Sequence, residues 1–232
     1  MVKARAPALG EDPASVPDKK MPFRMNKAQR RFLDRIWNRN VVLKARQVGI
    51  TTLICILWLD HALFVPDQRC GIVAQDDGAA KAIFRDKVKF AYDNLPAQIK
   101  RRFPLEKDAA DELLFKHNNS SIRVATSMRS GTLDRLHVSE MGKISAMYPI
   151  KAAEVVSGSI PSVPDEGIVV VESTAEGREG AFFDMVETAQ KALAERLKLV
   201  ARRATSSLPS IATRVESWPS PSASTLVCKR SS

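Results

Sequence analysis

The residues of this chain with the clearest chemical potential lie in one short segment, Lys44-Ala45-Arg46-Gln47-Val48-Gly49-Ile50-Thr51-Thr52. The common phosphate-binding loop has the pattern G-x-x-x-x-G-K-[ST] and lies between a strand and a helix. When the segment is aligned on Gly49 and Thr51, Lys44 stands where the first glycine belongs, and Ile50 stands where the lysine belongs. The segment therefore departs from the simple pattern, and its chemistry has to be inferred from its parts.

Those parts fit the binding of a nucleoside triphosphate. Gly49 permits close approach of the backbone, and a helix that begins after it presents unpaired N–H groups and a positive dipole end to phosphate. Thr51 offers a hydroxyl to Mg²⁺. Positive charge comes from Lys44 or Arg46, and an arginine can bind phosphate oxygens through two hydrogen bonds. The alternative is a strand–turn–helix connection with incidental charge.

A second candidate residue is the acid that ends an apolar run. An ATPase with a phosphate loop needs a glutamate that polarises the attacking water, usually beside a carboxylate that assists Mg²⁺. Glu140 follows the run Arg135-Leu136-His137-Val138-Ser139 and is predicted to be the catalytic acid. Ser139 stands where an aspartate is common and would reach Mg²⁺ through water, with Asp134 as a weaker substitute. The alternative for Glu140 is a helix-capping acid.

The segment KARQVGITT resembles the deviant phosphate loop of phage terminase large subunits, which place a basic residue early and often lack the late lysine. Terminases also show a similar strand that ends in Ser-Glu. Residues 21–49 are similar to the start of their ATPase domain, where a glutamine on the preceding helix contacts adenine. Gln29 matches that glutamine, and a solvated helix glutamine is the alternative. The resemblance implies that nucleotide is bound by Gln29, Lys44, Arg46, Gln47, Gly49, Thr51 and Thr52, with Arg46 also acting in catalysis.

A third motif follows Glu140 along the chain. Residues 169–177 read VVVESTAEG, which resembles the coupling motif of terminases and helicases, a strand followed by Ser-Thr-Ala-x-Gly. Small hydroxyl residues can sense the γ-phosphate and pass its loss to moving parts. Ser173, Thr174 and Gly177 are therefore predicted to couple hydrolysis to motion, with a strand-ending turn as the alternative. Arg129 and Arg178 stay open, because each could face DNA, a neighbouring subunit's phosphate or solvent.

The elements that must position these residues alternate between strands and helices. Short apolar runs predict strands at residues 41–43, 70–74, 136–138 and 167–171, and a hairpin over residues 112–115 and 121–125. Periodicity and caps predict helices at residues 26–37, 51–63, 76–94 and 179–203. This order predicts an α/β fold, a P-loop NTPase-like three-layer sandwich with a mostly parallel central sheet, plus the hairpin. The loops at residues 44–51, 139–140 and 173–177 should then meet at the carboxyl edge of the sheet.

Composition limits the function less than the motifs do. The net charge is +10, but residues 196–232 hold seven bases and one acid (+6), and residues 1–195 hold 29 bases and 25 acids (+4). Charge alone therefore does not establish DNA binding. The three cysteines form no metal or redox pair, and Cys55 and Cys70 in apolar runs predict reduced core residues of a cytosolic protein. No run of about 18 apolar residues suggests a membrane span.

These patterns divide the chain into a flexible arm (residues 1–20), a terminase-like ATPase domain (residues 21–204) and a Ser- and Pro-rich tail, disordered or out of frame (residues 205–232). The resemblance implies an enzyme that uses ATP and Mg²⁺ to move double-stranded DNA into a procapsid in the host cytoplasm. Its implied partners are a portal protein, a small terminase subunit and further copies in a ring, with no membrane involved.

A terminase nuclease domain is not expected in this chain, because Asp184 is the only aspartate after Asp165. We therefore expect no nuclease activity, as for a truncated prophage product. Two alternatives remain for the ATPase function. One is a helicase-like, DNA-stimulated ATPase, and the other is a nucleotide-binding prophage remnant without turnover.

Overall fold

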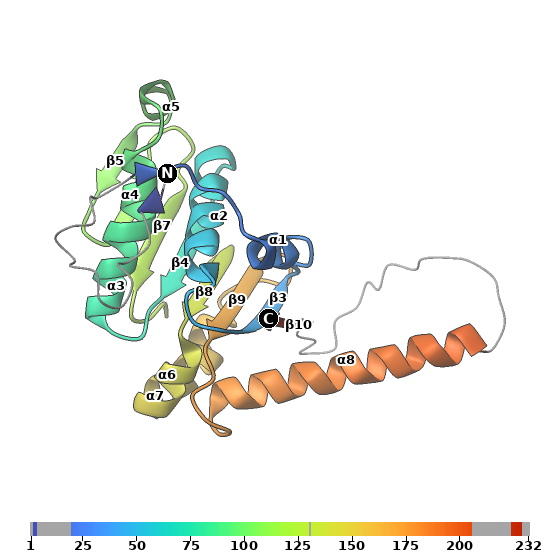
Figure 1. Ribbon diagram of the computed structural model, residues 1–232. Coiled ribbons are helices and arrows are strands. Elements are labelled where there is room, and N and C mark those ends of the chain that lie inside the picture. Colours follow the sequence, from blue (N-terminus) through green and yellow to red (C-terminus); the bar gives the residue numbers. More distant parts are fainter. Residues whose placement is uncertain (1, 4–19, 130, 206–223, 229–232) are drawn as a thin grey trace, which may run out of the picture.

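A central β-sheet organises the computed structural model, which describes residues 2–3, 20–129, 131–205 and 224–228, with side chains for residues 21–129 and 131–195. The sheet has eight strands in the order β10-β3-β9-β8-β4-β7-β6-β5 (Figure 1). They are β3 (Arg39–Lys44), β4 (Arg69–Val73), β5 (Leu105–Asp108), β6 (Glu112–Phe115), β7 (Ser121–Ala125), β8 (Arg135–Ser139), β9 (Ile168–Ser173) and β10 (Ser224–Cys228). All neighbours pair in parallel except β5–β6 and β6–β7. A separate pair joins β1 (Val2–Lys3) to β2 (Lys20–Met21).

Helices cover both faces of this sheet (Figure 1). They are α1 (Lys27–Leu33), α2 (Ile50–Phe64), α3 (Asp77–Ile83), the π-helix η2 (Phe84–Lys89), α4 (Phe90–Asp93), α5 (Ala97–Arg102), α6 (Met141–Met147), α7 (Pro149–Glu154), the π-helix η3 (Val155–Ser159) and α8 (Ala181–Thr205). The predicted helix over residues 76–94 forms as one helical run of α3, η2 and α4. Asp76 is its N-cap, as expected, and accepts a hydrogen bond from the backbone N–H of Ala79.

The alternation of side chains along the strands produces two cores. Val42 and Val170 belong to a cluster with α1, α2 and the α3–η2–α4 run, whereas Val41 and Val171 belong to a second cluster with α6, α7 and α8. Successive residues of a strand point to opposite faces, so β-branched residues in adjacent positions fill both cores. The predicted three-layer α/β fold with a mostly parallel sheet is therefore confirmed.

The middle helix α2 is the largest contributor to the first core. Leu53, Ile54 and Trp58 are each at most 2% exposed, and burying a side chain of this size contributes about 1.5–3 kcal/mol. Because α2 begins directly after the loop at residues 45–49, this burial also fixes where that loop ends. The segment predicted to bind phosphate is thus anchored by the best-packed helix of its face.

Several elements differ from the sequence-based expectations. The predicted hairpin forms between β6 and β7, but β5 adds a third antiparallel strand that was not predicted. The helix expected over residues 26–37 ends at Leu33, and α5, α6 and α7 were not predicted. Most of the predicted arm and tail lies outside the described residues. Within the tail, however, the structure has a strand, β10, which pairs with β3.

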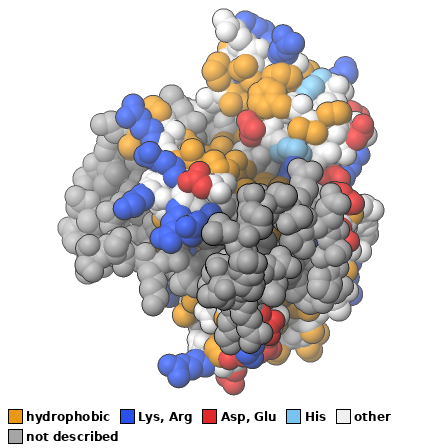
Figure 2. Space-filling view, turned by 90° about the vertical axis from the view of Figure 1, so that its right-hand side faces the viewer, with side chains coloured by type: hydrophobic (Ala, Val, Ile, Leu, Met, Phe, Trp, Pro, Cys, Tyr) orange, Lys and Arg blue, Asp and Glu red, His pale blue; other side chains and the backbone are white. Residues whose placement is uncertain are grey.

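Charged side chains on the surface follow the expected amphipathic pattern of α1, whose Gln29 and Phe32 are buried. Its exposed side chains include Lys27, Arg30 and Arg31. Figure 2 shows Lys and Arg side chains gathered in one group at the left of the face it draws. In the described part of the chain, no helix is both long and apolar enough to cross a membrane.

Candidate active site

Three neighbouring parallel strands bring the predicted site residues to one edge of the sheet. In the ladder β3-β9-β8, Leu43 pairs with Ser173 and Ser139 pairs with Glu172, so the three strands end at the same level. Val42 and Val170 pack on the α2 side, and the strand pleat puts Lys44 and Glu172, two residues farther on, on that same side. The expectation that the three loops meet at one carboxyl edge is confirmed.

The loop between β3 and α2 turns through two residues in the left-handed region, and α1 with its N-cap residue holds the loop in place. Gln47 and Gly49 both have positive φ, at 62° and 76°. Asn26 Nδ2 donates a hydrogen bond to the Val48 carbonyl (3.0 Å), and Gln29 Nε2 donates to the Gly49 carbonyl (2.7 Å). Gln29 Oε1 accepts from the Asn26 backbone N–H, which completes a capping box. The structure therefore places Gln29 against the loop backbone, and its contact with adenine stays a prediction.

The two basic residues of this region, Lys44 at the end of β3 and Arg46 in the loop, have different surroundings. Arg46 is exposed, and its guanidinium makes no hydrogen bond or ion pair with another described residue. The Lys44 side chain is 7% exposed, and its Nζ lies 2.7 Å from Glu140 Oε1 and 3.0 Å from Glu172 Oε2. Burial lowers the pKa of Lys44, but the carboxylates of Glu172 and Glu140 outweigh burial and raise it. Lys44 is thus a buried counter-ion, and Arg46 is the cation that faces outward.

Glu140 occupies a strained position between β8 and α6. Its φ of 59° lies in the left-handed region, which costs a non-glycine residue of order 1–3 kcal/mol. Although Glu140 is the N-cap residue of α6, its side chain makes no cap hydrogen bond, so the helix-capping alternative is not supported. Instead, Oε1 pairs with Lys44, and Oε2 accepts long 3.4 Å hydrogen bonds from the hydroxyls of Ser173 and Thr174.

Glu172 is a site residue that sequence reasoning missed. It is 0% exposed, and its Oε1 lies 2.8 Å from Thr51 Oγ1, 3.0 Å from Ser139 Oγ and 3.2 Å from His137 Nε2. Burial raises the pKa of Glu172, but the hydrogen bond and charge of His137, together with Lys44, lower it to about 2. The sequence signal was present, because Glu172 is the one acid in the apolar run Ile168–Ser173.

The remaining predicted residues lie at varied distances from this cluster. Thr52 accepts a 3.5 Å hydrogen bond from Lys87 Nζ, on the α3–η2 side of α2. Gly177 has a φ of 112° in the segment after Thr174. Asp134 as a substitute metal ligand is wrong, because it precedes β8 at the opposite edge of the sheet and accepts a hydrogen bond from the Arg69 backbone N–H.

The two open arginines and the cysteines are also placed. Arg129 forms an ion pair with Glu154, and Arg178 is exposed in the segment after β9. Cys55 and Cys70 are free and buried, and burial raises the pKa of each thiol to about 12. The prediction that these two cysteines are reduced core residues is confirmed, whereas the roles of the two arginines stay open.

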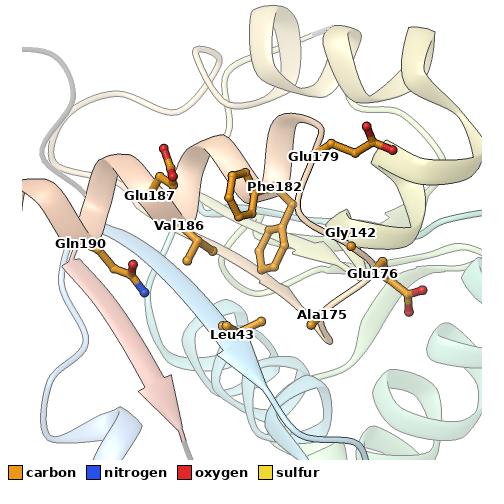
Figure 3. A pocket seen from close by; sticks show the side chains of 11 residues that line it. Leu43, Gly142, Ala175, Glu176, Glu179, Phe182, Val186, Glu187 and Gln190 are labelled. Carbon is orange, nitrogen blue, oxygen red and sulfur yellow. The ribbon is translucent and has the colours of Figure 1, made fainter.

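A hollow of about 250 Å³ opens on the other face of the same edge, between β3 and α8 (Figure 3). Its apolar lining includes Leu43, Phe182 and Val186, and Ala175 and Glu176 border it from the predicted coupling segment. Ser173 and Thr174 are buried, but Ala175 and the residues up to Gly180 are exposed. The coupling segment thus leaves the core directly after the residues that contact Glu140, and it borders open space.

The fold can be compared with known proteins at this point. No protein-family model and no curated protein sequence matches the chain. Among solved structures, it is similar to the HK97 bacteriophage large terminase, with a TM-score of 0.59 and 16% identity over 76% of this chain. It is also similar to the ATPase domain of the Thermus phage P74-26 large terminase, with a TM-score of 0.54 and 16% identity over 72% of this chain.

The chain has the fold of a phage large terminase ATPase domain. It spans 38% of the HK97 large terminase and 71% of the P74-26 ATPase domain. A mutant of the P74-26 domain gives the same result, with a TM-score of 0.56. The terminase resemblance that rested on three short motifs therefore extends to the architecture, while the sequence identity stays low.

Proposed function

We propose that this chain is the ATPase motor domain of a phage or prophage terminase large subunit, which hydrolyses ATP to drive double-stranded DNA into a procapsid. The position of Glu140 carries the proposal. One of its oxygens pairs with Lys44, on the strand that leads into the phosphate loop, and the other receives the hydroxyls of Ser173 and Thr174. A single acid thus contacts both segments that an ATP-driven motor has to link.

The residues at this edge fit ATP bound with Mg²⁺. The N-cap of α2 is Gly49, which has no side chain to cap the helix, so the first N–H groups of α2 suit phosphate oxygens. The Thr51 hydroxyl, in the first turn of α2, is an oxygen ligand of the kind that Mg²⁺ prefers. When bound, Mg²⁺ would neutralise charge that develops on the phosphates.

Each residue then has a distinct role in hydrolysis. The loop around Gly49 holds the phosphates, and the exposed Arg46 stabilises the negative charge that grows on the γ-phosphate in the transition state. Glu140 orients the attacking water and polarises it through a carboxylate oxygen. Ser173 and Thr174, which share that carboxylate, pass the change in the site to the exposed segment after them. Lys44 forms ion pairs with both neighbouring carboxylates and holds them close together.

The activity that we propose needs several partners. They are double-stranded DNA, a portal protein and a small terminase subunit, with further copies of the chain arranged as a ring in the host cytoplasm. A packaging assay with portal-bearing procapsids separates this function from that of a helicase-like ATPase, which would hydrolyse ATP on DNA without filling a capsid.

The direct test is ATP turnover by the purified protein, with and without double-stranded DNA. Glu140→Gln should lower turnover by roughly 10²- to 10⁴-fold, as expected for loss of a general base, while binding of a fluorescent ADP analogue is retained. Arg46→Ala should also lower turnover. Glu106→Gln, an exposed glutamate on the edge strand β5, is the matched control. Wild-type protein that binds nucleotide without turnover would instead identify an inactive remnant, and full activity in Glu140→Gln would refute the site assignment.

A further inference from the structure

The strand end that should provide a carboxylate for Mg²⁺ carries a serine in this chain. In phosphate-loop NTPases, Mg²⁺ is held by the hydroxyl of the loop Ser/Thr and by an aspartate on a neighbouring strand. Here the position of that aspartate is taken by Ser139, which is 3% exposed. A serine hydroxyl brings no negative charge, so β8 alone leaves the predicted Thr51 site without its anionic partner.

The adjacent strand places a carboxylate at the same level. Glu172 of β9 pairs with Ser139 of β8 in the parallel ladder, so the two side chains stand next to each other. The Ser139 hydroxyl donates a 3.0 Å hydrogen bond to Glu172 Oε1. That same oxygen accepts a 2.8 Å hydrogen bond from Thr51 Oγ1. The loop threonine and the strand serine are therefore joined through one glutamate.

The surroundings of Glu172 are those of a site rather than of a core. Burying an ionised carboxylate is costly unless charges and hydrogen bonds compensate it. Oε1 has three polar neighbours, and among the described residues the buried Oε2 meets only the Lys44 ammonium, at 3.0 Å. A carboxylate whose Oε1 already contacts the hydroxyl predicted to bind Mg²⁺ is placed to share that cation with Thr51.

We propose that Glu172 supplies the carboxylate of the Mg²⁺–nucleotide site, in the role of the aspartate that Ser139 replaces. This inference rests on the proposed function, because it assumes that nucleotide binds at the Gly49 loop. Glu172 then acts together with Thr51, and Ser139 acts by holding Glu172 in position. Glu140 keeps a separate role toward the attacking water, so one acid of the cluster binds Mg²⁺ and the other orients water.

The test is a Mg²⁺ titration of nucleotide binding, which does not depend on turnover. A fluorescent ADP analogue at fixed concentration is titrated with MgCl₂, and the Mg²⁺ concentration at half-saturation is compared between variants. Glu172→Gln should raise that concentration by about 10- to 100-fold, the scale seen when groups that tune a metal site are removed, with little change of affinity in EDTA. The control Glu106→Gln should match the wild type.

A variant that moves the carboxylate from β9 to β8 separates a metal-binding role of Glu172 from a structural one. Glu172→Gln removes the anion that His137 contacts and leaves Lys44 with Glu140 as its one carboxylate among the described residues, so thermal unfolding is measured to show whether the variant folds. The double variant Ser139→Asp with Glu172→Gln places a carboxylate at the paired position on β8. Its Mg²⁺ concentration at half-saturation should lie within about threefold of wild type, a much smaller change than the one expected for Glu172→Gln alone.

The outcomes distinguish this inference from the proposed function. A folded Glu172→Gln protein with a wild-type Mg²⁺ titration would overturn the role of Glu172 and leave the proposed function intact. A folded double variant whose Mg²⁺ titration is not restored would also overturn the role of Glu172, because a carboxylate at this level of the sheet would then not be enough for Mg²⁺ binding. Wild-type protein that binds no nucleotide at any Mg²⁺ concentration would refute the proposed function itself.

Discussion

Gly142 is the residue through which the link between Glu140 and the coupling segment can be tested most directly. It lies in the first turn of α6, and a Cβ atom built on it would lie 2.7 Å from Ser173 Oγ and 3.0 Å from the Thr174 carbonyl oxygen. The second of these atoms belongs to the backbone and cannot rotate away. Gly142→Ala should therefore push the segment that begins at Ser173 away from α6 and from Glu140.

The magnitude follows from two opposing effects. Overpacking of a tight core costs about 1–3 kcal/mol, while alanine stabilises a helix interior relative to glycine by about 0.5–1 kcal/mol. The difference predicts a net destabilisation of about 0–2.5 kcal/mol for Gly142→Ala, centred on about 1 kcal/mol. Gly158 in η3 is the matched control, because a Cβ there would meet nothing within 4 Å. Gly158→Ala should be neutral or stabilising by a few tenths to about 1 kcal/mol.

Two measurements check this prediction. Urea denaturation gives the free energies of unfolding of both variants, and steady-state assays give ATP turnover and nucleotide affinity. Gly142→Ala should lower turnover more than nucleotide affinity, because the phosphate loop is untouched while the hydrogen bonds from Ser173 and Thr174 to Glu140 are displaced. If Gly142→Ala were as stable and as active as Gly158→Ala, the close contact between α6 and the coupling segment would not exist, and the reasoning would fail.

Two further predictions concern the loop and the helix caps. Gln29→Ala should destabilise the protein by about 1–3 kcal/mol, because a buried residue that satisfies two backbone groups is removed, and it should also weaken nucleotide binding. Urea denaturation measures the first effect and titration with an ADP analogue measures the second, with Gln98→Ala, at an exposed glutamine, as the control. Equal behaviour of the two variants would contradict this prediction. Asp76→Ala should cost about 1 kcal/mol through loss of the α3 cap. The pKa of Asp76 is lowered, chiefly by the hydrogen bond from the Ala79 N–H, so its contribution is full above the ordinary carboxyl pKa and is lost as pH falls through the lowered value. Urea denaturation across acidic pH should therefore show less acid sensitivity in Asp76→Ala than in wild type, and parallel pH profiles would refute this.

The sequence predicted most of the fold because apolar runs with β-branched residues alternate with helical periods. The strand ending at Ser139 and the helix beginning after Gly49 could be recognised in this way, and their shared edge follows from parallel pairing. Short elements such as α5 and β5 carry too few residues for a period to show. The π-turns of η2 and η3 could not be predicted, because nothing in their residue pattern distinguishes them from α-helix.

The site was only partly predictable because side-chain partners depend on three-dimensional register. From the sequence, Lys44 is a basic residue near phosphate, but its burial between Glu140 and Glu172 appears only when β3, β9 and β8 lie side by side. Glu172 lies near the end of an apolar run, and the sequence does not show which strands will pair with that run in the sheet. The sequence predicted that Ser139 would reach Mg²⁺ through water, whereas its hydrogen bond to Glu172 appears only in the structure.

The central place of β9 in the ladder β3-β9-β8 has a mechanical consequence. Hydrogen bonds hold β9 on both sides along its length, so the strand cannot slide by one residue without breaking two ladders at once. The strand therefore holds the loop after β3 and Glu140 after β8 at a fixed spacing. If the proposed function holds, displacement begins where both ladders stop, at Thr174, and the residues beyond it move relative to a strand that stays in place.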